Sequence, residues 1–312
     1  MRSPYLLFGL GAAFSFVTAS AAPLTPDAAK NCSACAEWNQ PQAPFVLYGK
    51  SWYVGTQGLS AVLIDSGAGL VLLDGALAES APLIAANIQK LGYQLDQIKY
   101  IAVSHAHYDH VGGVAALARA SGATVIASAR NAQALAAGTT AKDDPQAGFG
   151  DKENSFPKVK NAKIIADGET LRLGRLALTA HYTPGHTPGA TSWSWQDCVD
   201  GECLNLVYAD SLNAVSDDNY RFGGTDGAGG IAAAFRASIA RVAALPCDLV
   251  VPVHPGFAQL EEKLAQRAQG VKPDPLIDRG ACERYAAAAG EKLEARLLRE
   301  RSGAEQRSSS EH

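Results

Sequence analysis

The chain has 312 residues, of which 47% are hydrophobic and 19% are charged. This composition is typical of a globular protein with a sizeable core, built as one large domain or two small ones. The formal net charge is −4 and no run of Lys and Arg exceeds two residues, so we expect no nucleic acid partner.

Residues 1–21 predict a signal peptide. Arg2 precedes an apolar segment from Tyr5 to Val17, and residues 19–21 supply the small side chains that a signal peptidase recognises. A membrane anchor is the alternative, but the segment is too short to span a bilayer comfortably. We therefore expect cleavage after Ala21, a periplasmic or secreted chain without a membrane span, and a single domain over residues 22–302.

The first half of this domain predicts a sheet with helices. Between residues 45 and 74, short apolar runs separated by glycines predict a meander of antiparallel strands. Residues 79–91 carry apolar side chains at helical spacing. We then expect a buried strand that ends at Val103, a helix over residues 111–121 and a strand over residues 123–127.

A polar stretch over residues 138–161 predicts a long loop, which in a compact enzyme is often a binding element. The second half then repeats the pattern of the first. Strands are expected at 163–165, 176–182, 191–195, 204–209 and 249–253, a helix at 230–244, a terminal helix at 283–301 and a disordered tail at 303–312. Two strand-rich halves with helices between them predict an α/β fold in which two packed sheets are covered by helices.

The six cysteines form an even set, which in an exported protein favours disulfides over free thiols. Cys198 and Cys203 bracket a short turn between two strand-like runs, which suits a local cross-link. Cys32 and Cys35 have the spacing of a redox pair or a zinc knuckle. Their Pro- and Ala-rich surroundings favour a structural bridge or a loop feature instead.

The segment IAVSHAHYDHVGG, residues 101–113, predicts a metal site. A buried apolar run stops at Ser104, and His105, His107, Asp109 and His110 follow within six residues. Buried polar groups need partners, and such a crowd of imidazoles and a carboxylate in one strand-to-helix turn would be costly as ordinary core. A dinuclear metal site would supply those partners.

Two further histidines follow strand-like runs later in the chain. His186 lies in the turn TPGHTPG and His254 in the segment VVPVHPG. Either residue alone is more often a structural histidine than a ligand. Together with the first cluster they predict one site at which strand ends converge, because imidazole and carboxylate are the ligands that zinc prefers.

These segments resemble the metallo-β-lactamase superfamily, in particular SHAHYDH, PGHTPG, YADS and the late HPG. The longer segments PGHTPGATSWSW, YADSLNA and LPCDLVVPVHPG are similar to subclass B3 metallo-β-lactamases. The resemblance runs from about Trp38 to Leu297. It implies a four-layer αββα sandwich with a dinuclear metal site at one edge of the sheets.

The resemblance also implies two zinc ions and their ligands. His105, His107 and His186 would hold the first ion, and Asp109, His110 and His254 would hold the second. The implied reaction is hydrolysis of the β-lactam amide bond of penicillins, cephalosporins and carbapenems by a hydroxide held between the metals, which Asp109 orients. The expected partner is a small-molecule β-lactam, and the protein is expected to be a monomer.

Substrate contacts and disulfides are likewise implied by the resemblance. Ser211 would bind the carboxylate of the drug, and Asn213 stands where the subclass usually has a second hydroxyl; an amide can still donate a hydrogen bond. Trp38, Phe149 and Phe156 would either wall the pocket or pack their own loops. The resemblance favours a Cys247–Cys282 bridge and is compatible with Cys198–Cys203, which leaves Cys32 with Cys35.

Two other functions stay open. One is a lactonase or a thioesterase such as glyoxalase II, in which an aspartate bridges both metals; Asp210 would have to point between the metals. The other is a non-catalytic zinc-binding protein, which the open coordination positions of the expected ligand sets disfavour.

Overall fold

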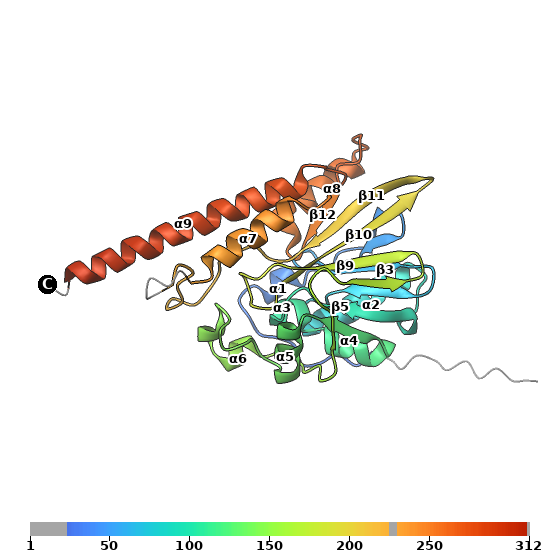
Figure 1. Ribbon diagram of the computed structural model, residues 1–312. Coiled ribbons are helices and arrows are strands. Elements are labelled where there is room, and N and C mark those ends of the chain that lie inside the picture. The colour runs from blue at the N-terminus through green and yellow to red at the C-terminus, as the bar shows by residue number, and fades with distance from the viewer. Residues whose placement is uncertain (1–23, 225–229, 311–312) are drawn as a thin grey trace, which may run out of the picture.

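The computed structural model describes residues 24–224 and 230–310, with side chains up to residue 302 (Figure 1). The predicted signal peptide lies outside the described residues. Within the described part of the chain, no helix combines the length and the apolarity that crossing a membrane requires.

The first sheet has seven strands in the order in which they follow along the chain. They are β1 (Phe45–Tyr48), β2 (Ser51–Tyr53), β3 (Val62–Asp65), β4 (Leu70–Leu73), β5 (Ile98–Ala102), β6 (Thr124–Ala127) and β7 (Lys163–Ile164). Strands β1 to β4 pair antiparallel, which confirms the predicted meander, and β4 to β7 pair parallel.

The second sheet has five strands in the order β12-β11-β10-β9-β8. They are β8 (Thr170–Leu173), β9 (Leu176–Tyr182), β10 (Thr191–Val199), β11 (Glu202–Ala209) and β12 (Leu249–Pro252). Strands β8 to β11 pair antiparallel, whereas β11 and β12 are parallel, so these last two end at the same edge of the sheet.

Helices lie on both outer faces of the paired sheets (Figure 1). The described α-helices are α1 (Cys35–Trp38), α2 (Ala81–Lys90), α3 (Tyr108–Val111), α4 (Val114–Ser121), α5 (Ala129–Ala137), α6 (Asp151–Asn154), α7 (Ala232–Ala243), α8 (Leu260–Ala268) and α9 (Ala281–Ser310). Helices α2 and α4 are on the side of the first sheet, and α7 and α9 are on the side of the second.

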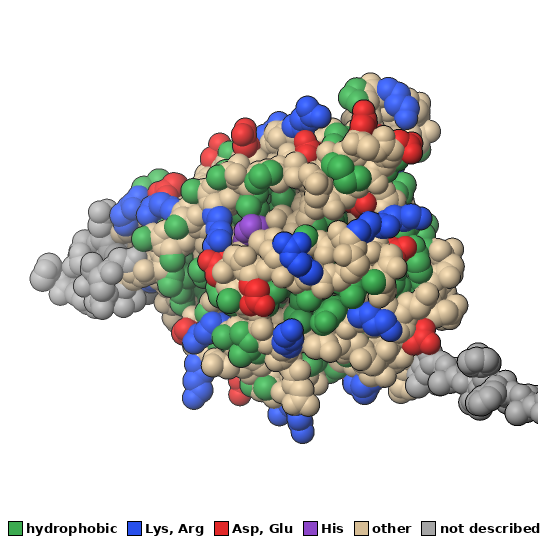
Figure 2. Space-filling model, turned by 45° about the vertical axis from the view of Figure 1, so that its right-hand side comes forward, with side chains coloured by type: hydrophobic (Ala, Val, Ile, Leu, Met, Phe, Trp, Pro, Cys, Tyr) green, Lys and Arg blue, Asp and Glu red, His purple; other side chains and the backbone are tan. Residues whose placement is uncertain are grey.

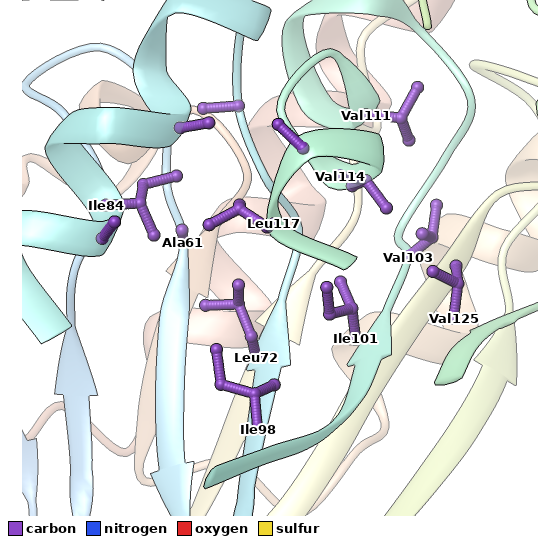
Figure 3. Close-up of a cluster of buried hydrophobic side chains, with 14 of the residues drawn as sticks. Ala61, Leu72, Ile84, Ile98, Ile101, Val103, Val111, Val114, Leu117 and Val125 are labelled. Carbon is purple, nitrogen blue, oxygen red and sulfur yellow. The ribbon is translucent and has the colours of Figure 1, made fainter. Parts of the chain in front are cut away.

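Three separate hydrophobic cores hold these four layers together. Neighbouring residues of a strand point to opposite faces of the sheet, so a strand with apolar side chains on both faces can join two cores. In β4, Val71 packs into the core between the sheets, while Leu72 packs against the helices. Figure 3 shows Leu72 on the helix side, near Leu117 of α4. The predicted αββα sandwich is therefore confirmed.

Residues around the predicted 138–161 loop are more helical than the sequence analysis expects. Helix α5 precedes it, and a 3-10 helix, η3 (Ala147–Phe149), and α6 lie within it. Ser128 caps the start of α5, because its hydroxyl accepts a hydrogen bond from the amide of Asn131. Gly138, in a left-handed conformation, caps the end of the helix. These are ordinary cap signals. We missed the helix because its alanines give little hydrophobic contrast.

Three other expectations differ from the structure. Strand β8 and helix α8 are not in the predicted set; α8 has no buried residue, so no apolar period marks it. The tail from residue 303 is predicted to be disordered, whereas α9 continues to Ser310. That stretch lacks proline and contains Ala, Glu, Gln and Arg, which favour helix.

The structure contains three disulfides, which are the Cys247–Cys282 pair that the resemblance favours, the compatible Cys198–Cys203 pair and the remaining pair. Their partners are Cys32 with Cys35, Cys198 with Cys203, and Cys247 with Cys282. Cys198 and Cys203 face each other across the β10–β11 hairpin. Cys247 lies just before β12 and Cys282 in the first turn of α9, so this bridge ties the long helix to the second sheet.

Candidate metal centre

The predicted ligands gather at the edge where β5 and β12 end. His105 and His107 follow β5, His186 lies in the connection from β9 to β10, and His254 follows β12. Because β5 and β12 belong to different sheets, the sandwich brings residues far apart in the sequence to one place.

A buried aspartate, Asp74, fixes the turn that carries the first histidines. Its carboxylate accepts hydrogen bonds from the amide nitrogen of Ser104 at 2.7 Å, from the hydroxyl of Ser104 at 2.5 Å and from the hydroxyl of Tyr208 at 2.9 Å. The Ser104 carbonyl accepts from the Asn131 side chain at 3.0 Å and from the Thr191 amide. Hydrogen bonds from both sheets therefore hold the residue that precedes His105.

Burial raises the pKa of Asp74 to about 7, although the hydrogen bonds from Ser104 and Tyr208 lower it. Asp74 is not among the predicted site residues. Asp74 directly follows the apolar run of residues 70–73. A carboxylate at the end of a buried strand indicates a hydrogen-bonding partner nearby, because buried polar groups need partners.

Three imidazoles form the first donor group. Ligand atoms of His105, His107 and His186 lie within 4.8 Å of one another, and all three residues are buried. The ring centroids are 4.7 to 4.9 Å apart. Nε2 of His105 is buried and has no hydrogen-bond partner among the described residues.

Each of these rings uses its other nitrogen in a hydrogen bond on the outer side. Nδ1 of His105 lies 2.6 Å from a carboxylate oxygen of Asp210, and Nε2 of His107 lies 3.1 and 3.2 Å from the two oxygens of Asp144. Nδ1 of His186 lies 2.8 Å from the carbonyl oxygen of Asn213. The carbonyl of Asn213 only accepts, so Nδ1 of His186 carries its proton. Nδ1 of His105 and Nε2 of His107 carry theirs when Asp210 and Asp144 are ionised, a state that burial opposes at Asp210 by raising its pKa. The inner nitrogens are left as lone-pair donors, the state in which imidazole binds a metal.

The second donor group adjoins the first. His105, Asp109 and His110 also place ligand atoms within 4.8 Å of one another. Asp109 Oδ2 lies 3.2 Å from Nε2 of His110 and 3.4 Å from Nε2 of His254, and the His110 and His254 rings are 4.9 Å apart. Neither ring nitrogen of His110 makes a hydrogen bond of good geometry with a described residue.

The pKa shifts favour the metal-binding protonation state at four residues of the cluster and oppose it at His107. Burial lowers the pKa of His105 and of His110, and it lowers the pKa of His186 to about 3. For His107, burial alone would lower the pKa, but Asp144 outweighs it and the net pKa is raised. Burial opposes ionisation of Asp109, yet the neighbouring His110 and His254 hold its pKa well below the usual value. The shifts therefore favour neutral rings at His105, His110 and His186 and an ionised Asp109, whereas the shift at His107 favours the protonated ring until a metal ion displaces its proton.

The donor groups open into a cavity of about 610 Å³. Ser211 and Asn213, the predicted substrate-binding residues, line it, and so does Trp38, whose ring is 5.3 Å from that of His254. Figure 2 shows one face of the molecule on which a histidine reaches the surface between Lys and Arg side chains.

The two aromatic residues predicted in the 138–161 loop, Phe149 and Phe156, do not line this cavity. Phe156 is buried in the core beneath the first sheet, and Phe149 is exposed. The 138–161 loop contributes Gln146 to the cavity instead, and the sequence analysis gave no reason to choose it. The loop therefore borders the site as expected, but it does so through Gln146 and not through the two predicted aromatic residues.

Asp210 lies behind His105 and is completely buried. It belongs to neither donor group and does not line the cavity. The arrangement that the thioesterase alternative requires, with this carboxylate between the metals, is not the one in the structure.

Comparison with known proteins agrees with this geometry. The family model described as the metallo-beta-lactamase superfamily matches residues 54–254, and the chain belongs to that superfamily. Solved structures narrow the similarity to subclass B3. MEM-A1, a subclass B3 metallo-beta-lactamase from a soil metagenome library, is 44% identical with a TM-score of 0.80, covering 85% of this chain and 99% of that one.

Two other solved structures are similarly close. The Rm3 metallo-beta-lactamase is 45% identical with a TM-score of 0.83, covering 87% of this chain and 100% of that chain. MIM-1 from Novosphingobium pentaromativorans is 40% identical with a TM-score of 0.78, covering 86% of this chain and 94% of that one. The resemblance to subclass B3 that the sequence indicates is confirmed.

Curated sequences give a more distant match. A hydroxyacylglutathione hydrolase of Anaeromyxobacter dehalogenans is 31% identical over 196 residues, which are 63% of this chain and 62% of that protein. The chain spans less than two thirds of the length of the first curated relatives that it matches.

The hydrogen bond from His107 to Asp144 gives a testable prediction. In Asp144→Ala, Nε2 of His107 loses its acceptor, so the ring is less well oriented and the affinity for metal should fall about 10- to 100-fold. Titration of the metal-free protein with Zn²⁺ in a calorimeter measures this. Asp143→Ala is the matched control, because Asp143 is exposed and pairs with Arg130 at the surface. Equal losses in both variants would contradict the role of the hydrogen bond.

Proposed function

We propose that the protein is a subclass B3 metallo-β-lactamase that hydrolyses the amide bond of β-lactam antibiotics with two zinc ions. The observation that carries the proposal is the pair of adjoining donor groups at the floor of one cavity. Similarity to subclass B3 enzymes over 99% of the length of MEM-A1 supports it.

In this proposal His105, His107 and His186 hold one zinc ion, and Asp109, His110 and His254 hold the other. Zinc suits these ligands because they are imidazoles with a single carboxylate. Bound zinc would supply Lewis acidity, which lowers the pKa of water and polarises a carbonyl oxygen.

The protein's own residues position the reactants. Asp109 is ionised and lines the cavity, so its carboxylate is placed to accept a hydrogen bond from the attacking water and to orient it. Ser211 and Asn213 stand on the cavity wall as donors to the carboxylate of the drug. The outer partners of the histidines keep the rings from turning as substrate enters.

The main alternative is a thioesterase, because the curated relatives include hydroxyacylglutathione hydrolases. The position of Asp210 behind His105 is the specific observation against it. A direct assay separates the two functions, because they require different substrates.

We further propose that the chain is exported, acts as a monomer and loses residues 1–21. The apolar segment and the small residues Ala19, Ser20 and Ala21 support export and cleavage. The intact mass of protein recovered from the periplasm or the medium should correspond to a chain that begins at Ala22. A mass that still includes residues 1–21 would contradict the proposal.

The substrate assay tests the function itself. Purified protein loaded with zinc should hydrolyse a penicillin and a carbapenem, and a chelator should abolish the turnover. A homoserine lactone and an S-acyl glutathione thioester are the competing substrates. Turnover of either without turnover of any β-lactam would contradict the proposed function.

A second test addresses Asp109. In Asp109→Ala the second donor group loses its only carboxylate, so the protein should retain one zinc ion per chain instead of two, and kcat should fall about 10²- to 10⁴-fold. Elemental analysis and a steady-state assay measure the two effects. Asp143→Ala again serves as the control for loss of a carboxylate. Two retained zinc ions with normal turnover would show that the assignment of Asp109 is wrong.

A further inference from the structure

The described part of the chain places no permanent positive charge on the wall of the large cavity. Among the described residues, its lining includes two carboxylates, Glu37 and Asp109, and no Lys or Arg. Penicillins, cephalosporins and carbapenems carry a carboxylate, so a substrate of the proposed kind has an anionic group to place. Ser211 and Asn213 offer uncharged donors only, and charge-assisted hydrogen bonds are about twice as strong as neutral ones.

A lysine of α9, Lys292, stands beside this wall. Its ammonium lies 4.6 Å from the centre of the Phe257 ring. Lys292 lines a small hollow of about 40 Å³ together with Asn213 and Phe257, and both of these residues also line the large cavity. The hollow therefore adjoins the large cavity on the side of α9, and Lys292 lies on the far side of the residues that the two share.

The ammonium of Lys292 is available for a ligand. It is an exposed side chain, and no ion pair joins it to a described carboxylate. The contact with Phe257 is a cation–π interaction, which orients the ammonium without neutralising its charge. The side chain of Asn213 is similarly free, because its hydrogen bonds with described residues go through the backbone carbonyl, which accepts from Nδ1 of His186 and from the amide of Val215.

We propose that Lys292 is a specificity-determining residue that binds the substrate carboxylate together with the amide of Asn213. This inference rests on the proposed function. Asn213 stands where the subclass usually has a second hydroxyl, and its amide donates a neutral hydrogen bond, to which a cation beside it adds a charge-assisted one. The expected preference is for β-lactams with a free carboxylate over the same compounds as neutral esters.

The test compares Lys292→Gln and Lys292→Arg with the wild-type enzyme, on a cephalosporin and on its methyl ester. For the free acid, kcat/KM should fall about tenfold in Lys292→Gln, mainly through KM, because one charge-assisted hydrogen bond is lost. Lys292→Arg should keep most of the activity. The ester should be hydrolysed equally by all three proteins.

Salt and a distant lysine provide the controls. Added salt should weaken wild-type kcat/KM for the free acid more than that of Lys292→Gln, because the ammonium attracts the anion. Lys99→Gln removes the same charge at the opposite end of β5 and should behave like the wild type. An equal loss on acid and ester, or no loss on the acid, would overturn the role of Lys292 while wild-type turnover still supports the proposed function. Absence of wild-type turnover on every β-lactam would overturn both.

Discussion

The metal centre depends on the hydrogen bonds that lie behind the histidines. Imidazoles packed with their centres under 5 Å apart would repel one another if protonated and would lack partners if neutral. Asp210, Asp144 and the carbonyl of Asn213 each form a hydrogen bond with the outer nitrogen of one ring. The inner nitrogens of His105, His107 and His186 are left to bind metal through their lone pairs. Because these three acceptors come from different segments, the cluster forms only when the whole sandwich is assembled.

The sheets supply that assembly. Asp74 at the end of β4 binds Ser104, and Tyr208 of β11 reaches the same carboxylate from the second sheet. The turn after β5 is thus attached to both sheets through one buried acid. The Cys247–Cys282 bridge adds a further constraint, since it ties α9 to the segment that leads into β12 and His254. Tyr285 of α9 also donates to the carbonyl of Asp210, so the long helix supports the residue that orients His105.

Much of this could be predicted from the sequence because the signals are local. Strand ends followed directly by His105, His186 and His254 mark the edge where the loops converge, and apolar runs on both faces mark the buried strands. The outer partners gave no such signal. Asp144 lies in a polar loop among other acids, and only its burial, at 4% exposure, distinguishes it from the exposed Asp143. Burial is a property of the assembled chain, as is the placement of Lys292 beside Asn213.

The central claim is that two adjoining donor groups bind two metal ions on one cavity floor. Anomalous diffraction at the zinc edge from crystals of the zinc-loaded protein tests it most directly. The account predicts two peaks, one surrounded by His105, His107 and His186 and the other by Asp109, His110 and His254. A single peak, or a second peak away from Asp109, would contradict it.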